Sequence, residues 1–172
     1  VGEVPELPGV LHQVIAPSTE NLAQKDALTA DQLQNALNAG DHASQRAADN
    51  RAQLFVGGDM GIGNTTPSTA IIAAFSGIPV PELTGRGTGL DDGALAHKIG
   101  VIERGLALNK PDPADPIDVL AKVGGLEIGG IAGLVIGAAG YGIPVICDGL
   151  ISTAGALIAC VLAPAAKNYL FV

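Results

Sequence analysis

Tryptophan is absent from the 172-residue chain, and aromatic residues of all kinds make up only 3% of it. The two cysteines, Cys147 and Cys160, stand in apolar runs typical of buried thiols rather than of a disulfide. Lysine and arginine number 9 against 17 acids, so we expect neither general nucleic-acid binding nor electrostatic attachment to anionic membranes. No uninterrupted apolar run reaches the roughly 20 residues of a membrane span, which favours an α/β core over a membrane protein.

Glycine is abundant instead, with 24 residues, and small aliphatic side chains dominate the hydrophobic 48% of the chain. The length suits one domain with a real core. We therefore expect residues 1–172 to form a single α/β domain whose helices and sheet pack closely without large rings.

Residues 54–70 carry the main functional signal. A strand-like run at 54–56 leads into glycines and one acid, Asp59, before Asn64, Thr65 and Pro67 mark a helix start. Unpaired backbone N–H groups and a helix dipole would then face an anion, most often phosphate. Asp59 would repel phosphate, so we assign it another role, such as a base or an acceptor for a sugar hydroxyl.

The specificity of this stretch is limited. It is not a P-loop, because no Gly-Lys-Ser/Thr follows, and Thr66 replaces the last glycine of a dinucleotide fingerprint. A plain strand-to-helix turn without a ligand is an equally good interpretation.

The remaining chain shows a similar plan. Glycine loops at 84–92 and 123–127 each precede a predicted helix, the second with Gly129, Gly133 and Gly137 four residues apart. Other predicted elements are a short strand at 10–15, a helix from the capping box at 29–32 to about residue 50, a short helix at 116–122, a buried strand at 143–147 and a helix at 150–162.

Both main strands end shortly before an acid, Asp59 or Asp148, and parallel strands bring such ends to one edge of a sheet. Arg86 and Lys98 offer cationic partners for an anion. The residues alone therefore predict a pocket for a phosphorylated small molecule. Simpler roles remain open: a solvated lysine for Lys98, a helix-dipole partner for Glu127 and a helix cap for Asp148.

Three long segments carry a resemblance to a known family: GDMGIGNTTPSTA at 58–70, VGGLEIGGIAGLVIGAA at 123–139, and the run at 144–164 that begins PVICDG. They resemble nicotinate-nucleotide–dimethylbenzimidazole phosphoribosyltransferase, a family of cobalamin lower-ligand synthesis. The resemblance extends from about Asn21 onward. It implies a Rossmann-like three-layer α/β core, with a parallel sheet flanked by helices and truncated at both ends, and a cytoplasmic homodimer.

The resemblance also implies a glycosyltransferase reaction. Phosphoribose passes from nicotinate mononucleotide to dimethylbenzimidazole, giving α-ribazole phosphate and nicotinate, with no metal or organic cofactor. As nicotinate leaves, the sugar carbon gains oxocarbenium character. Such an enzyme must fix the phosphate, align both bases and take a proton from the incoming ring nitrogen.

By the same resemblance, Asp59 and Lys98 are the catalytic candidates. Asp59 stands where family members usually carry glutamate, and Glu127 stands where they often carry aspartate. The substrate-binding candidates are Gly61, Ile62, Asn64, Thr65, Gly87, Glu127, Asp148 and Gly149.

The family's proposed general base, a glutamate in a Glu-Gly-Ser-Gly segment, is missing from this sequence. Because the chain also starts at Val1 and ends in apolar residues, we expect a core fragment that binds ligand weakly at most. Two other functions remain open. One is a noncatalytic phosphate- or nucleotide-binding module, and the other is a scaffold whose groove at Gly129, Gly133 and Gly137 receives a partner helix.

Overall fold

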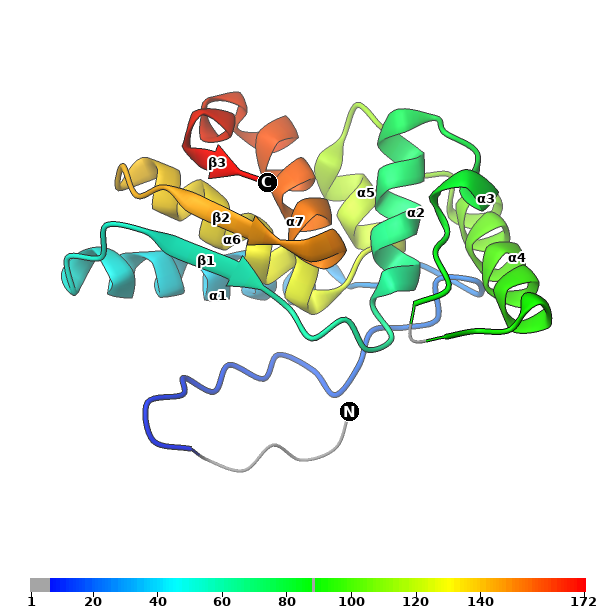
Figure 1. Cartoon of the computed structure of the whole chain (residues 1–172), viewed down its shortest axis with the longest axis horizontal. Helices are drawn as coiled ribbons and strands as arrows, with labels where there is room; N and C mark the ends of the chain where they lie inside the picture. The colour runs from blue at the N-terminus through cyan, green and yellow to red at the C-terminus, as the bar shows by residue number, and fades with distance from the viewer. Residues whose placement is uncertain (1–6, 88) are drawn as a thin grey trace.

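A computed structural model describes residues 7–87 and 89–172, in which helices pack against one face of a small parallel sheet (Figure 1). The elements in chain order are α1 (Ala30–Asp49), β1 (Phe55–Gly58), α2 (Thr65–Ser76), α3 (Val80–Leu83), α4 (Asp92–Asn109), α5 (Pro116–Val123), α6 (Leu126–Gly140), β2 (Val145–Asp148), α7 (Gly149–Leu162), the 3-10 helix η1 (Pro164–Tyr169) and β3 (Leu170–Phe171).

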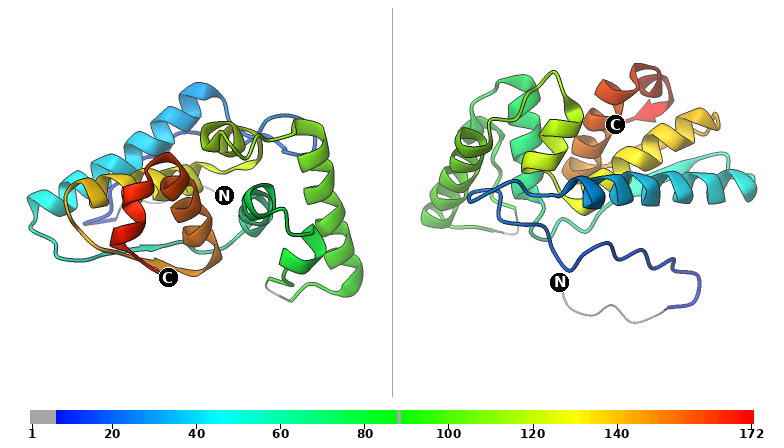
Figure 2. Two further views of the ribbon diagram at one scale, coloured as in Figure 1. Left: turned by 90° about the horizontal axis from the view of Figure 1, so that it is seen from above. Right: turned by 180° about the vertical axis from the view of Figure 1, so that it is seen from behind.

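The sheet has the strand order β1-β2-β3, and both strand pairs are parallel. Helices α6 and α7 lie on one side of it, and α1 runs along α6 (Figure 2). Val56, Ile146 and Phe171 are register partners, form one row across the three strands and are exposed. The predicted fold class, a parallel sheet flanked by helices, is confirmed; within the described residues the row of Val56, Ile146 and Phe171 is left open to solvent.

The helices α1 and α6 approach so closely that glycine is required at their contact. A β-carbon on Gly133 would lie 2.0 Å from the backbone oxygen of Leu37, and one on Gly40 would lie 1.8 Å from that of Gly130. The predicted glycine groove therefore exists, but α1 of the same chain fills it. The scaffold hypothesis, in which this groove receives a partner helix, is wrong.

Most predicted helices are confirmed within a residue or two. Thr29 accepts a hydrogen bond from the backbone N–H of Gln32 and completes the predicted capping box of α1. The short strand expected at 10–15 is wrong: these residues have no strand partner, and Val10, Leu11 and Val14 are exposed. Strand β1 extends further than predicted, because Gly58 pairs in register with Asp148.

No helix in the described part of the chain combines the length and apolar character that crossing a membrane requires.

Candidate functional site

The first glycine loop is a tight turn held by Asp59. Its Oδ1 accepts hydrogen bonds from the backbone N–H of Gly61, at 3.1 Å, and from the side-chain amide of Asn64. Gly61 and Gly63 have φ of +57° and +81°, in the left-handed region that favours glycine. The sequence folds this way locally because a short acid followed by glycines can turn back to receive N–H donors.

Lys98, on α4, reaches across to the start of α2. Its Nζ lies 2.9 Å from Oγ1 of Thr65 and 3.5 Å from the backbone oxygen of Gly85. Burial lowers the pKa of Lys98. Among the described residues, no carboxylate lies within 4.0 Å of this ammonium group, so its charge is not neutralised by an ion pair.

A cavity of about 410 Å³, here called the cationic cavity, lies between the first and second glycine loops. Its lining is formed by the first loop, the start of α2, the second loop and Lys98: Gly61, Ile62, Gly63, Thr65, Thr66, Arg86, Gly87, Leu90 and Lys98. Arg86 is engaged by Asp92 and by the backbone oxygen of Leu90. The cavity offers one uncommitted ammonium group and a helix N-terminus, which together suit a phosphate.

A larger cavity of about 700 Å³, here called the acidic cavity, shares Ile62, Gly63 and Thr66 with the cationic one. Asp59, Asn64 and Glu127 line it, and residues 16–22, including Glu20, form a wall. None of its described lining residues is a lysine, arginine or histidine. A ligand that spans both cavities would therefore meet cationic groups at one end and carboxyl groups at the other.

Glu127 lies in the first turn of α6. Burial raises the pKa of Glu127, and the nearby charge of Asp59 raises it further. Its own backbone N–H and the side-chain amide of Asn64 favour the ionised form and oppose this rise without cancelling it. Asn64 is only 8% exposed, and its Oδ1 has no hydrogen-bond partner.

Asp148 and Gly149 follow from β2 at the same edge of the sheet. Asp148 is in register with Gly58, the residue before Asp59, so the two strand-end acids converge as predicted. Asp148 is exposed, and its side chain makes no hydrogen bond that caps α7. Neither residue lines the two cavities, so they lie beside the paired cavities rather than in them.

The other predicted site residues come together. Gly61, Ile62, Thr65, Gly87 and Lys98 line the cationic cavity, and Asp59, Ile62, Asn64 and Glu127 line the acidic one.

Sequence reasoning missed the wall at residues 16–22 and the lining residues Leu90 and Val101. The wall has no regular secondary structure beyond turns and meets the site only in three dimensions, so no local pattern marked it. Thr66 could have been found, because it belongs to the predicted helix start.

Comparisons with known proteins agree with this arrangement. The family profile described as "Phosphoribosyltransferase" matches residues 1–172. The chain is 57% identical over 166 residues to nicotinate-nucleotide–dimethylbenzimidazole phosphoribosyltransferase of Geobacter sulfurreducens, covering 96% of this chain and 47% of that protein. It is 50% identical over 168 residues to the protein of the same name in Chloroflexus aggregans, covering 98% and 48%.

Among solved structures, the chain is similar to CobT from Thermus thermophilus, with a TM-score of 0.91 and 43% identity over 99% of this chain and 51% of that one. The chain thus spans about half the length of the relatives it matches.

Proposed function

Because the chain belongs to the phosphoribosyltransferase family, we propose that its protein transfers phosphoribose from nicotinate mononucleotide to dimethylbenzimidazole, giving α-ribazole phosphate and nicotinate. The two relatives of this name compared above are 57% and 50% identical to this chain where they align. The chain itself supplies the part of the site that holds phosphoribose.

One observation supports this assignment most directly: Lys98 binds the hydroxyl of Thr65 at the N-terminus of α2 and has no carboxylate partner in the described structure. In the proposed complex the phosphate lies in the cationic cavity. Lys98 and the N-terminus of α2 hold it, and Gly61 and Gly87 let the backbone approach closely.

The sugar then lies over Ile62 and Gly63, which border both cavities, and its reacting carbon faces Asp59. Positive charge develops at that carbon as nicotinate leaves, and a fixed carboxylate stabilises it. Asp148 and Gly149, beside this edge of the sheet, contact the ribose from the neighbouring strand end. Asp59 and Lys98 are thus the proposed catalytic groups, and Asn64, Thr65 and Glu127 complete the substrate contacts.

A homodimeric assembly, a cytoplasmic location and a single α/β domain over residues 1–172 belong to the same proposal, on the strength of the family resemblance. We expect this chain alone to bind ligand without turnover, because the family's glutamate base segment is not in its sequence. Robust turnover would contradict that expectation. Sedimentation of the protein at several concentrations tests the dimer.

The direct test is calorimetric titration of the chain with nicotinate mononucleotide. Lys98→Ala should weaken binding about tenfold or more, since a hydrogen bond to a charged group contributes roughly 1.5–3 kcal/mol. Asp148→Ala should weaken it less, because Asp148 lies outside the cavities.

Lys167→Ala is the matched control: it removes the same charge from an exposed lysine of η1 that lines neither cavity. Equal affinities of the Lys98 and Lys167 variants would remove the main support for the proposal.

A further inference from the structure

Asn64 stands at the N-cap of α2, where an asparagine oxygen usually accepts a backbone N–H of the first turn. Here the side chain makes no such bond. Its amide nitrogen donates to Asp59 instead, and its Oδ1 is buried with no donor. An unsatisfied buried acceptor is unfavourable by about 1–3 kcal/mol, so this oxygen calls for a physical explanation.

Rotating the amide by 180° does not remove the problem. One N–H of Asn64 points at Asp59, and the amide also interacts with the carboxyl group of Glu127. Turning Oδ1 toward either carboxylate would set two acceptors against each other. A protonated carboxyl can supply the missing hydrogen bond, because it becomes a donor where it stands.

We propose that Glu127 is protonated in the ligand-free protein and forms a cyclic pair with Asn64, whose amide also donates to Asp59. In this pair the O–H of Glu127 donates to Oδ1 of Asn64, and the carbonyl oxygen of Glu127 accepts an N–H of the same amide. The second N–H of Asn64 remains with Asp59. The two N–H groups and the Oδ1 of Asn64 then each make one hydrogen bond with Asp59 or Glu127.

The charges around Glu127 agree with a neutral carboxyl. Asp59 faces it across Asn64, and Glu20 lines the same cavity from the N-terminal wall, where it is paired with Lys25. Lys98 lines the neighbouring cavity instead, and Lys122 of α5 is paired with Asp118. Burial raises the pKa of Glu127 in the same direction. If Glu127 were ionised, its carboxylate would share the acidic cavity with that of Asp59, and no cation of the described residues would lie between the two.

The proton arrangement at Glu127 does not depend on the proposed function, but its consequence for the reaction does. If the sugar lies where we place it, Asn64 is a positioning residue: it orients Asp59 toward the reacting carbon and keeps Glu127 neutral. Of the two carboxyl groups that contact Asn64, Asp59 alone then faces the positive charge that develops in the transition state. The proton arrangement itself can be tested in the protein without ligand.

The test is a ¹³C NMR titration of glutamate side-chain carboxyls, with Glu127 assigned through Glu127→Gln. We expect Glu127 to titrate above the ordinary glutamate value of about 4.3. Asn64→Leu decides the geometry. If the cyclic pair exists, this variant lowers the pKa of Glu127, because the neutral carboxyl loses two hydrogen bonds and the ionised one loses only one. If Asn64 merely donates an N–H to ionised Glu127, the same variant raises it. An upward or absent shift would overturn the proposal.

A second measurement covers the case in which the Asn64 variant does not fold. A glutamine at position 127 can form the same cyclic pair through its amide, whereas an alanine cannot. Glu127→Gln should therefore unfold at a higher temperature than Glu127→Ala. Wild-type stability should also fall relative to Glu127→Gln as pH rises through the folded pKa of Glu127, since that pKa is raised. Equal stability of the two variants, or a pH trend of the opposite sign, would refute the pair independently of any ligand result.

Discussion

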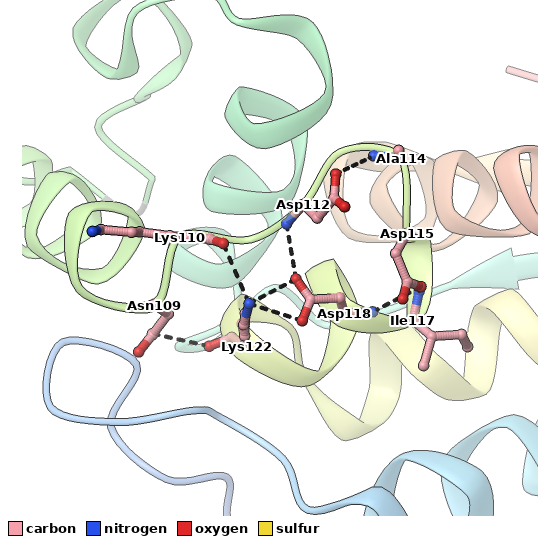
Figure 3. A network of polar contacts seen from close by, with 8 residues as sticks. All are labelled: Asn109, Lys110, Asp112, Ala114, Asp115, Ile117, Asp118 and Lys122. Carbon is pink, nitrogen blue, oxygen red and sulfur yellow. Dashed lines mark hydrogen bonds and ion pairs between the residues drawn. The ribbon is translucent and has the colours of Figure 1, made fainter.

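Two lysines in the described part of this chain have opposite surroundings: the ammonium group of Lys122 is paired with a carboxylate, and that of Lys98, the proposed phosphate ligand, is not. Lys122, on α5, places its Nζ 2.8 Å and 2.9 Å from the two carboxyl oxygens of Asp118 and 3.3 Å from the backbone oxygen of Lys110 (Figure 3). Lys98 contacts a hydroxyl and a backbone oxygen and no carboxylate among the described residues.

The polar groups around Lys122 satisfy one another. Asp118 also accepts from the backbone N–H of Asp112 at 2.8 Å, and Asp115 accepts from the first turn of α5 (Figure 3). The pKa of Lys122 is raised, chiefly by its hydrogen bond with Asp118. The pKa of Lys98 is lowered by burial. An ammonium group paired with a carboxylate of the same chain, as in Lys122, stabilises the contact between α5 and the segment before it. An ammonium group without a carboxylate partner is available to an incoming anion.

The largest effect is expected when Lys98 receives a carboxylate partner like the one that Lys122 has. Thr65→Glu places a carboxylate at the first residue of α2, within reach of Lys98 Nζ. Affinity for nicotinate mononucleotide should fall by about a hundredfold or more, because an anion is added and a cation is neutralised. Thermal stability should hold or rise, because acids suit helix N-termini. Calorimetry tests the predicted loss of affinity, and thermal unfolding tests the predicted stability. Retained affinity would contradict the proposed phosphate position.

A smaller effect comes from titrating Lys98. Because burial lowers its pKa, the ammonium group loses its proton at a lower pH than an ordinary lysine. Affinity for nicotinate mononucleotide should therefore decline on the alkaline side as pH rises through that lowered pKa. Lys98→Ala should abolish this part of the pH profile and leave the remainder unchanged. The same alkaline decline in the variant would show that another group controls it.

The smallest effect is expected at Asp118, the carboxylate partner of Lys122. For Asp118, burial raises the pKa, but the hydrogen bonds from Lys122 and from the Asp112 backbone outweigh it, and the net pKa is lowered. Its contribution to stability is therefore present above the unfolded pKa and is lost as pH falls through the folded one. Asp118→Asn should lower the thermal midpoint slightly at neutral pH, less in acid, and leave ligand affinity unchanged. A loss of affinity would connect this network to the site.

How well a feature could be predicted from the sequence depends on how far apart in the chain its residues lie. The capping box at Thr29 and the turn that joins Asp59 to Asn64 are local, and their residue types specify them. The contact of Lys98 with Thr65 joins residues 33 positions apart. The residues alone suggested both for an anion pocket, but no local pattern showed that they touch each other.

The features that were missed or misread are non-local ones. The wall at 16–22 carries no periodic signal, and the apolar run at 10–15 resembled a strand although no neighbouring strand exists to pair with it among the described residues. The glycine spacing of α6 predicted a close helix contact correctly, but the partner could not be read from α6 alone. That partner is α1, whose own Gly40 makes the approach possible.

The contact between α1 and α6 also limits how this site can change. Carbonyl oxygens occupy the positions where β-carbons of Gly40 and Gly133 would lie, so the two helices are interlocked through their main chains. Neither can slide past the other without steric clash, and they should move as one rigid body. Glu127 lies in the first turn of α6, so its backbone should move only together with both helices. A substitution at Gly40, in the helix behind the site, could therefore misplace a carboxyl group that it never touches.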